Sequence, residues 1–186
     1  SLNILPTVLY HHLGDPRKHL KKDYKIDFTP LNETNTIIMK SPNKQTVING
    51  TLGMTVTRGK ADESVENQLL LQLNKTPIYY NALVNYKEMA PQYDYVVVAT
   101  GRETEARDMG LWEDMGSITV IGASVIGSFD ISTSTVYFNT EYAGTGYGRL
   151  TPYNRNSALV DLYIIGKPEN QALELFERFK QLENLT

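Results

Sequence analysis

The chain has 186 residues, no cysteine and a formal net charge of −3 at pH 7. A chain without cysteine cannot form a disulfide framework, a thiolate metal site or a cysteine nucleophile, and this composition is typical of a cytoplasmic protein. The weakly acidic balance excludes the basic surface by which proteins bind a nucleic-acid backbone, so no nucleic-acid partner is expected.

The first residues carry few functional signals. The chain opens with Ser1-Leu2 rather than methionine, from which we expect a piece of a longer protein, and the opening SLNILPTVLYHH lacks the basic region of a signal peptide. Asp15 followed by Pro16 predicts the start of a short helix through RKHLKK. The three histidines lie between residues 11 and 19, where their spacing supplies no convergent set of ligands, so no metal site is expected.

The next segment changes from strands to a helix. Residues 25–58 predict neighbouring strands joined by turns, in the pieces NTIIMK, TVING and GMTVTRG. The following ADESVENQLLLQLN predicts a helix over residues 62–74. Its apolar residues Val65, Leu69 and Leu73 recur at spacings of four, and acidic residues crowd the first turn, where the helix dipole favours anions.

Between this helix and residue 116, the sequence predicts short strands at IYY and ALVNY and a buried strand over residues 95–99, within YDYVVVATGRETEAR. That strand ends in Thr100-Gly101. A glycine at a strand end lets the backbone approach a ligand closely, and ligands of open α/β sheets lie at the carboxyl ends of strands. We expect the apolar face of the 62–74 helix to pack on this strand, because each has an apolar surface and no other partner nearby in sequence.

Beyond Gly116 the composition becomes β-branched and aromatic. The runs SITVIGASVIGSF, STSTVYFNTEY and SALVDLYIIG predict consecutive antiparallel strands over residues 118–165, with one face buried. The GTGYG run at residues 144–148 lies between strands with no helix behind it, which predicts a hairpin loop rather than a phosphate cradle.

The carboxyl-terminal segment predicts an amphipathic helix that begins at Pro168. Its apolar residues at three-residue steps are Leu173, Phe176, Phe179 and Leu182. No transmembrane segment is expected, because the longest uncharged run, residues 115–129, contains glycines and serines. That run also falls short of the ~20 apolar residues that a membrane-spanning helix needs.

Taken in order, these pieces resemble the FAD-dependent oxidoreductases of the geranylgeranyl reductase family, within the p-hydroxybenzoate hydroxylase-like fold. Members have an arginine-bearing strand, a short spacer, an acidic turn and spaced leucines, which residues 58–73 match. They then have a strand that closes in Asp-Gly, where this chain has Thr100 in the aspartate position. Their antiparallel sheet holds an aromatic-glycine-aromatic-x-x-Pro turn, matched by GYGRLTPY, with Arg149 where an aromatic is usual. The resemblance covers roughly residues 15–165.

The resemblance implies an α+β fold, in which an antiparallel substrate-domain sheet stands beside part of an α/β FAD-binding layer. The sheet would comprise residues 25–57 and 116–186, and the cofactor layer residues 1–24 and 58–115. The residues implied to border the FAD are Arg58, Thr100 and Gly101, and those implied to border the substrate pocket are Tyr147 and Tyr153. The sequence lacks the GxGxxG turn that seats the FAD pyrophosphate. The chain is therefore expected to be a fragment that binds FAD weakly or not at all and is inactive alone, with a relative that no longer binds flavin as the alternative.

The implied activity of the parent enzyme is hydride transfer from reduced FAD to a carbon-carbon double bond of an isoprenoid or another small apolar substrate. The rest of the parent chain would be its partner, and no catalytic side chain is identified. Two alternatives stay open. One is a flavin monooxygenase that acts on an aromatic substrate. The other is a non-catalytic module in which the sheet and its rear helix enclose a lipid or small apolar ligand, which the absence of an acid–base constellation favours.

Overall fold

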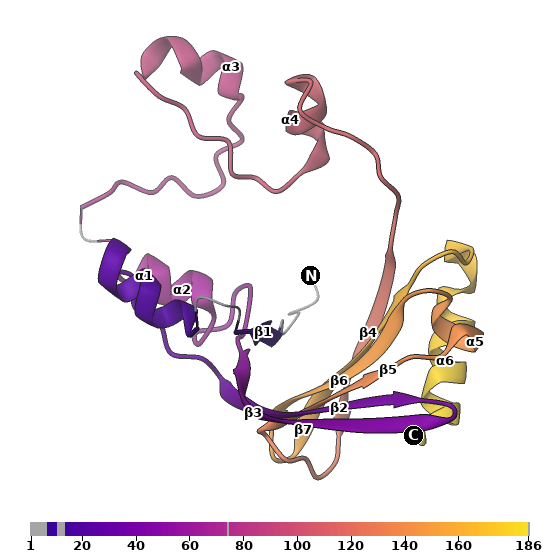
Figure 1. The fold of residues 1–186 in the computed structure, drawn as a ribbon. Coiled ribbons are helices and arrows are strands. Elements are labelled where there is room, and N and C mark those ends of the chain that lie inside the picture. Colours follow the sequence, from indigo (N-terminus) through magenta and orange to yellow (C-terminus); the bar gives the residue numbers. More distant parts are fainter. Residues whose placement is uncertain (1–6, 11–13, 74, 186) are drawn as a thin grey trace. The chain divides into compact units, whose positions relative to one another are not determined.

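The structure is a computed structural model that describes residues 7–10, 14–73 and 75–185, and Figure 1 shows its backbone. The elements in chain order are β1 (Thr7–Leu9), α1 (Pro16–Tyr24), β2 (Asn32–Ser41), β3 (Lys44–Thr55), α2 (Val65–Leu70), α3 (Tyr86–Met89), the 3-10 helix η1 (Ala90–Gln92), α4 (Glu103–Asp108), β4 (Thr119–Ile126), β5 (Thr133–Tyr137), α5 (Thr140–Ala143), β6 (Tyr147–Asn154), β7 (Ser157–Ile164), the 3-10 helix η2 (Glu169–Gln171) and α6 (Ala172–Leu182).

Seven strands form one sheet in the order β1-β3-β2-β5-β6-β7-β4. Neighbouring strands of this sheet are antiparallel except for β2 and β5, where residues 36–40 run parallel to residues 133–137. The prediction of an α+β fold with a mostly antiparallel sheet is confirmed.

The chain forms two compact units. The first, which we call the sheet unit, comprises Ser1–Asn74 and Ser117–Thr186, and the second, the insert unit, comprises Lys75–Gly116. Within the insert unit, α3 is tied to α4 because the Tyr86 hydroxyl donates to Asp108 Oδ2 at 2.7 Å. The assignment of residues 1–24 and 58–115 to a cofactor-binding layer stays a prediction.

The core of the sheet unit lies between the sheet and α6. Successive strand residues point to opposite faces, and one face of β5 and β7 meets the buried side of the helix. The predicted carboxyl-terminal helix is confirmed, but its buried residues are Leu175, Phe176 and Phe179, whereas Leu173 is 65% exposed. Because a helix turns once in 3.6 residues, apolar residues at three-residue steps drift away from the contact line.

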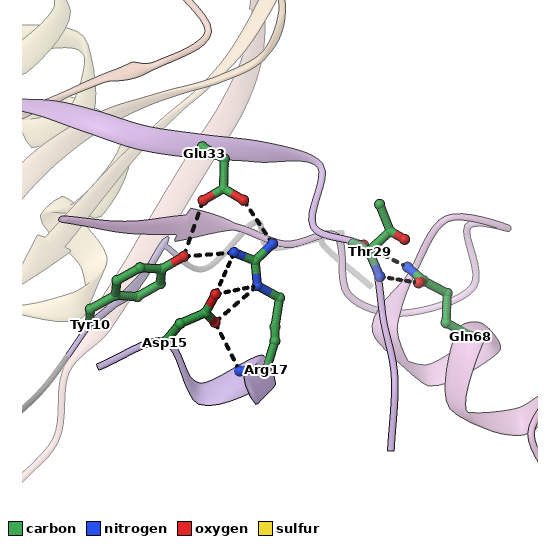
Figure 2. A network of polar contacts seen from close by, with 6 residues as sticks. All are labelled: Tyr10, Asp15, Arg17, Thr29, Glu33 and Gln68. Atoms are coloured by element: carbon green, nitrogen blue, oxygen red, sulfur yellow. Dashed lines mark hydrogen bonds and ion pairs between the residues drawn. The ribbon is translucent and has the colours of Figure 1, made fainter. Parts of the chain in front are cut away.

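A polar network around Arg17 fixes α1 to β2, as Figure 2 shows. Asp15 caps the helix by accepting from the Arg17 backbone N–H at 2.9 Å, and its carboxylate binds the Arg17 guanidinium at 2.7 Å. The same guanidinium contacts Glu33 of β2 at 2.7 Å and donates to the Tyr10 hydroxyl at 2.8 Å. The predicted helix start at Asp15-Pro16 is confirmed.

Helix α2 is shorter than the predicted helix over residues 62–74 and has no buried residue. Ser64 begins it, since its Oγ accepts from the Asn67 backbone N–H at 3.2 Å. Its contacts are polar: the Gln68 side chain bonds both the N–H and the C=O of Thr29, at 2.7 and 3.0 Å (Figure 2). The expectation of a buried apolar face is wrong, because a helix this short rests on caps and side-chain bonds rather than on burial.

Residues 95–99 do not form the predicted strand, and neither do IYY nor ALVNY. Tyr95 is 91% exposed and Val97 is 87% exposed. A strand is stable only beside a hydrogen-bonded neighbour, and the insert unit contributes α3, η1 and α4 but no strand among its described residues. The strand on which the 62–74 helix was expected to pack is therefore not formed.

The strands predicted over residues 118–165 are present, but they do not form an uninterrupted meander. Helix α5 separates β5 from β6, because Asn139 Oδ1 accepts from the Glu141 backbone N–H at 2.9 Å and caps a helical turn. Strand β4 pairs with β7 at the edge of the sheet rather than with β5. The prediction of consecutive strands is wrong here, since local capping outweighs the strand propensity of the segment.

The GTGYG run joins α5 to β6 and lies tightly against β7. A Cβ on Gly144 would lie 2.0 Å from the Ile165 carbonyl oxygen, and one on Gly146 would lie 1.9 Å from that of Tyr163. The backbone N–H groups of Thr145 and Gly146 donate to carbonyl oxygens of the chain at 3.2 and 3.0 Å. These glycines therefore serve close backbone packing, and the two amides are not available to a phosphate.

Candidate functional site

The face of the sheet opposite α6 carries a cluster of charged and aromatic side chains. Because Val160 and Leu162 of β7 belong to the core beneath α6, Asp161 and its neighbour two residues on point to the opposite face. The strand register pairs Arg149 with Asp161 across β6 and β7. We call this surface the Arg149 face, and its members are Val120, Gly122, Val136, Phe138, Tyr147, Arg149, Asp161 and Tyr163.

Arg149 and Asp161 form a two-point ion pair. Arg149 Nε donates to Asp161 Oδ1 at 3.1 Å, and Nη2 donates to Oδ2 at 2.5 Å. The side chains are 11% and 4% exposed, respectively. Arg149 Nη2 also donates to the Tyr163 hydroxyl at 3.1 Å, and that hydroxyl donates to Asp161 Oδ2 at 3.4 Å. A planar two-point contact of this kind holds the guanidinium in one orientation.

Burial and pairing act in opposite directions on the two charges. Burial raises the pKa of Asp161 above its ordinary value, although bonding to Arg149 acts to lower it. Burial also acts to lower the pKa of Arg149, but the bond and charge of Asp161, with smaller effects of Tyr163 and Tyr147, together outweigh this and raise it. Because the guanidinium stays charged beside the carboxylate, the pair places a fixed dipole, rather than a net charge, on the Arg149 face.

Three aromatic rings lie in a row beside the ion pair. The rings of Tyr147 and Tyr163 are stacked, with centroids 4.6 Å apart and planes at 18°, and Phe138 lies 6.4 Å beyond Tyr147. The Arg149 guanidinium lies 5.5 Å from the Tyr163 ring centroid. The rings give the Arg149 face an apolar surface next to one polar group, the Arg149–Asp161 pair.

On the other side of the ion pair, Gly122 of β4 lies directly opposite Asp161. A Cβ on this glycine would lie 3.1 Å from the Asp161 Cβ and 3.0 Å from the Val160 carbonyl oxygen. A larger residue would therefore crowd the carboxylate, and glycine keeps the surface beside Asp161 free of a side chain.

The two residues predicted to border the substrate lie far apart on β6. Tyr147 is in the aromatic row, whereas Tyr153 is half-buried at a β-bulge between Pro152 and Asn154. Six residues along a strand correspond to about 20 Å. The structure thus brings Tyr147 together with the ion pair and separates Tyr153 from it.

Arg58, predicted to border FAD, lies in the turn between β3 and α2. Its Nε donates to Glu66 Oε1 at 2.5 Å, and Glu66 Oε2 accepts from the Gly59 backbone N–H at 3.0 Å. Burial acts to raise the pKa of Glu66, but the bond and charge of Arg58 together with backbone N–H bonds outweigh it, and the pKa is lowered. The Arg58 charge is therefore already balanced within the turn, and it fits a phosphate contact less well than a free arginine.

Thr100 and Gly101, also predicted to border FAD, form a turn in the insert unit. The Thr100 hydroxyl lies 3.3 Å from Glu105 Oε2 and lines a hollow of about 240 Å³. Gly101 has a φ of +67°, and a Cβ there would meet no atom within 4 Å. Because the Thr100 hydroxyl already donates to Glu105, it fits a contact to a phosphate or ribose oxygen of a nucleotide cofactor less well than a free hydroxyl, whereas the left-handed Gly101 beside open space leaves the backbone accessible to a ligand.

Sequence reasoning missed Asp161 and Tyr163. The available signal was the single acidic residue in SALVDLYIIG, a strand that is otherwise apolar, because a charge in a buried strand needs a partner. The resemblance marks Arg149 only as a departure from an aromatic residue. The pairing of the two depends on the register of β6 and β7, which the sequence does not state.

Of the described residues, no three histidine, aspartate or glutamate side chains converge as a metal site requires, and His11 and His12 lie outside the described residues. Within the same ranges, no helix is long and apolar enough to cross a membrane. Neither models of known protein families nor curated proteins match this chain.

Proposed function

We propose that the chain is part of a cytoplasmic FAD-dependent oxidoreductase that reduces a carbon-carbon double bond of an isoprenoid or another apolar substrate. The observation that carries this proposal is the sheet. It is mostly antiparallel, it is backed on one face by α6, and its Arg149 face carries stacked rings around one ion pair. Such a surface suits an apolar ligand that has a single polar group.

In this proposal, FAD supplies the hydride when it is bound, and the residues of the chain hold and orient the cofactor and the substrate. The Thr100 hydroxyl and the Gly101 turn contact the edge of the cofactor. On the sheet unit, the rings of Tyr147 and Tyr163 lie along the apolar body of the substrate and exclude water from it, which strengthens each polar contact at this surface. Arg58 keeps the turn before α2 closed through Glu66.

The flavin monooxygenase remains the alternative within the same superfamily, and the stacked pair of Tyr147 and Tyr163 favours a ring-bearing ligand. The two activities differ in their products. Mass spectrometry of the product made by the parent enzyme separates them, because reduction adds two hydrogen atoms and hydroxylation adds one oxygen atom.

A non-catalytic binding module is the second candidate. The ion pair of Arg149 and Asp161 favours this candidate. A carboxylate that is paired with an arginine is less suited to taking a proton from a ligand than a free one. Such a module would bind an apolar ligand equally well whether or not its parent protein contains flavin.

The flavin content tests the proposal. The chain alone should purify colourless and should bind FAD weakly or not at all in a titration, because its sequence has no GxGxxG turn. A longer protein that adds the missing βαβ unit should purify yellow. A colourless longer protein would contradict the proposal. Stoichiometric flavin on the chain alone would contradict our account of what it lacks.

A further inference from the structure

The ion pair leaves one end of the Arg149 guanidinium without a partner. Nε and Nη2 bond to Asp161, and Nη2 also bonds to Tyr163. Within the part of the chain that the structure describes, Nη1 makes no hydrogen bond, and the side-chain atoms that are buried there without a partner are the hydroxyl oxygens of Thr57 and Thr151. Nη1 is therefore at least partly exposed, and its N–H groups can donate to an acceptor on the Arg149 face.

The environment of Nη1 selects the kind of acceptor that can bind there. The guanidinium is already held by Asp161, so a ligand that bonds to it immobilises no further side chain. The aromatic rings beside it favour an apolar body. A ligand carboxylate would meet the negative charge of Asp161, whereas a carbonyl oxygen accepts a hydrogen bond without bringing a second negative charge.

We propose that the Arg149 face binds an apolar molecule through a carbonyl oxygen, which accepts a hydrogen bond from Arg149 Nη1 while the apolar body lies along Tyr147 and Tyr163. This inference rests on the proposed function and names its substrate class, an α,β-unsaturated ketone or aldehyde with an apolar tail. The departure from an aromatic residue at position 149 is then the feature that admits the carbonyl group.

Reduced FAD, when bound, would supply a hydride to the β carbon and release a proton to water, and water would return one proton to the α carbon, so that oxidised FAD and the saturated carbonyl compound are the products. The role of the chain would be that of Arg149, whose positive charge would stabilise the negative charge that develops on the carbonyl oxygen. An isolated double bond would gain nothing from Arg149.

Binding to the chain alone provides the test. We would titrate it by calorimetry with β-ionone, a conjugated ketone, with β-ionol, the matching alcohol, and with β-ionylideneacetic acid, a carboxylate. The ketone should bind roughly tenfold more tightly than the other two, because the alcohol brings an O–H group that finds no acceptor beside the donor-only guanidinium, and the carboxylate brings a negative charge beside Asp161. Its ultraviolet band should also move to longer wavelength on binding, because a hydrogen bond polarises the conjugated carbonyl.

A double variant tests the role of the ion pair. Arg149→Met combined with Asp161→Leu removes both charges together, so neither is left buried and unpaired. It should lose the preference for the ketone, while the matched control Arg155→Met, at an exposed turn residue, should keep it. Circular dichroism of each variant shows whether it is folded.

The possible results distinguish a failure of the carbonyl-binding inference from a failure of the proposed function. Equal binding of ketone and alcohol by the unaltered chain, without a spectral shift, would overturn the inference and leave an apolar binding surface intact. A ketone preference that survives in the double variant would overturn the role of Arg149. Failure of all three compounds to bind would contradict the substrate surface itself, and with it the proposed function.

Discussion

Gly148 decides how closely α6 approaches the sheet. A Cβ at this position would lie 2.5 Å from Phe179 Cζ. Phe179 is fully buried, and its ring contacts those of Tyr137 and Tyr142 at centroid distances of 5.3 and 4.9 Å. It therefore has little room to move, since protein interiors are close-packed.

We expect Gly148→Ala to lower the free energy of unfolding by about 1 to 3 kcal/mol, as overpacking of a core does. Combined with Phe179→Leu, which replaces the obstructing ring, it should cost less than the sum of the two single changes. Urea unfolding of the three variants measures this. Strictly additive costs would show that the two positions are not in contact.

Tyr137 makes stability depend on alkaline pH. Burial, with a smaller effect from the charge of Glu183, raises the pKa of Tyr137 to about 12 from its ordinary 10.0. A raised pKa in the folded state means that its contribution to stability is complete below pH 10 and is lost as the pH rises through about 12.

The free energy of unfolding should therefore fall above pH 10, by up to about 1.4 kcal/mol per pH unit for this group. Tyr137→Phe should make the fall shallower, because it removes the group that titrates. Guanidinium unfolding at a series of pH values provides the measurement. An identical slope in Tyr137→Phe would refute the assignment.

Among the elements, α6 shows which of its residues stabilise the fold. Phe179→Ala should cost about 3 to 5 kcal/mol, as large core truncations do, because Phe179 is fully buried. Leu173→Ala, on the exposed side of the same helix, should cost less than about 0.5 kcal/mol. Chemical denaturation compares them. Similar costs would mean that the three-residue pattern, rather than the observed packing, describes the buried face.

At the other end of the sheet unit, α1 depends on Asp15. Asp15→Ala should cost about 1 kcal/mol at neutral pH, and Asp15→Asn less, because the amide oxygen can still cap the helix. The bond from Arg17 lowers the pKa of Asp15 below its ordinary 3.8. The Asp15 charge therefore stabilises the folded chain above pH 3.8, and this contribution is lost as the pH falls below that value. The difference between the unaltered chain and Asp15→Asn should close in acid, which thermal unfolding at several pH values can follow.

The elements that sequence predicts well are those with local signals. The pair Asp15-Pro16 predicts where α1 begins, and the β-branched runs predict that β4 and β7 are strands. The elements that sequence missed depend on distant partners. YDYVVVATGRETEAR has the composition of a buried strand but no neighbour in the insert unit, and the pairing of Arg149 with Asp161 requires a register between two strands.

At the scale of the molecule, the two units should differ in their protection against hydrogen exchange. Amides of β7 are bonded on both sides, to β6 and to β4, whereas residues 94–99 of the insert unit belong to no strand. We expect the 94–99 amides to exchange within seconds at neutral pH and those of β7 to persist for far longer. Mass spectrometry of the exchanged peptides measures both. Strong protection at residues 94–99 would indicate a strand partner.

The strand order separates the strands that precede the insert unit in sequence from those that follow it. β1, β3 and β2 come from residues before the insert unit, and β5, β6, β7 and β4 come from residues after it. The two sets meet where β2 runs parallel to β5, with the Asn32 side chain bonded to the carbonyl oxygens of Pro152 and Tyr153. A backbone cut inside the insert unit would leave each set of strands whole. The protein is thus arranged as a split pair, in which two separately made polypeptides could complement one another across one parallel seam.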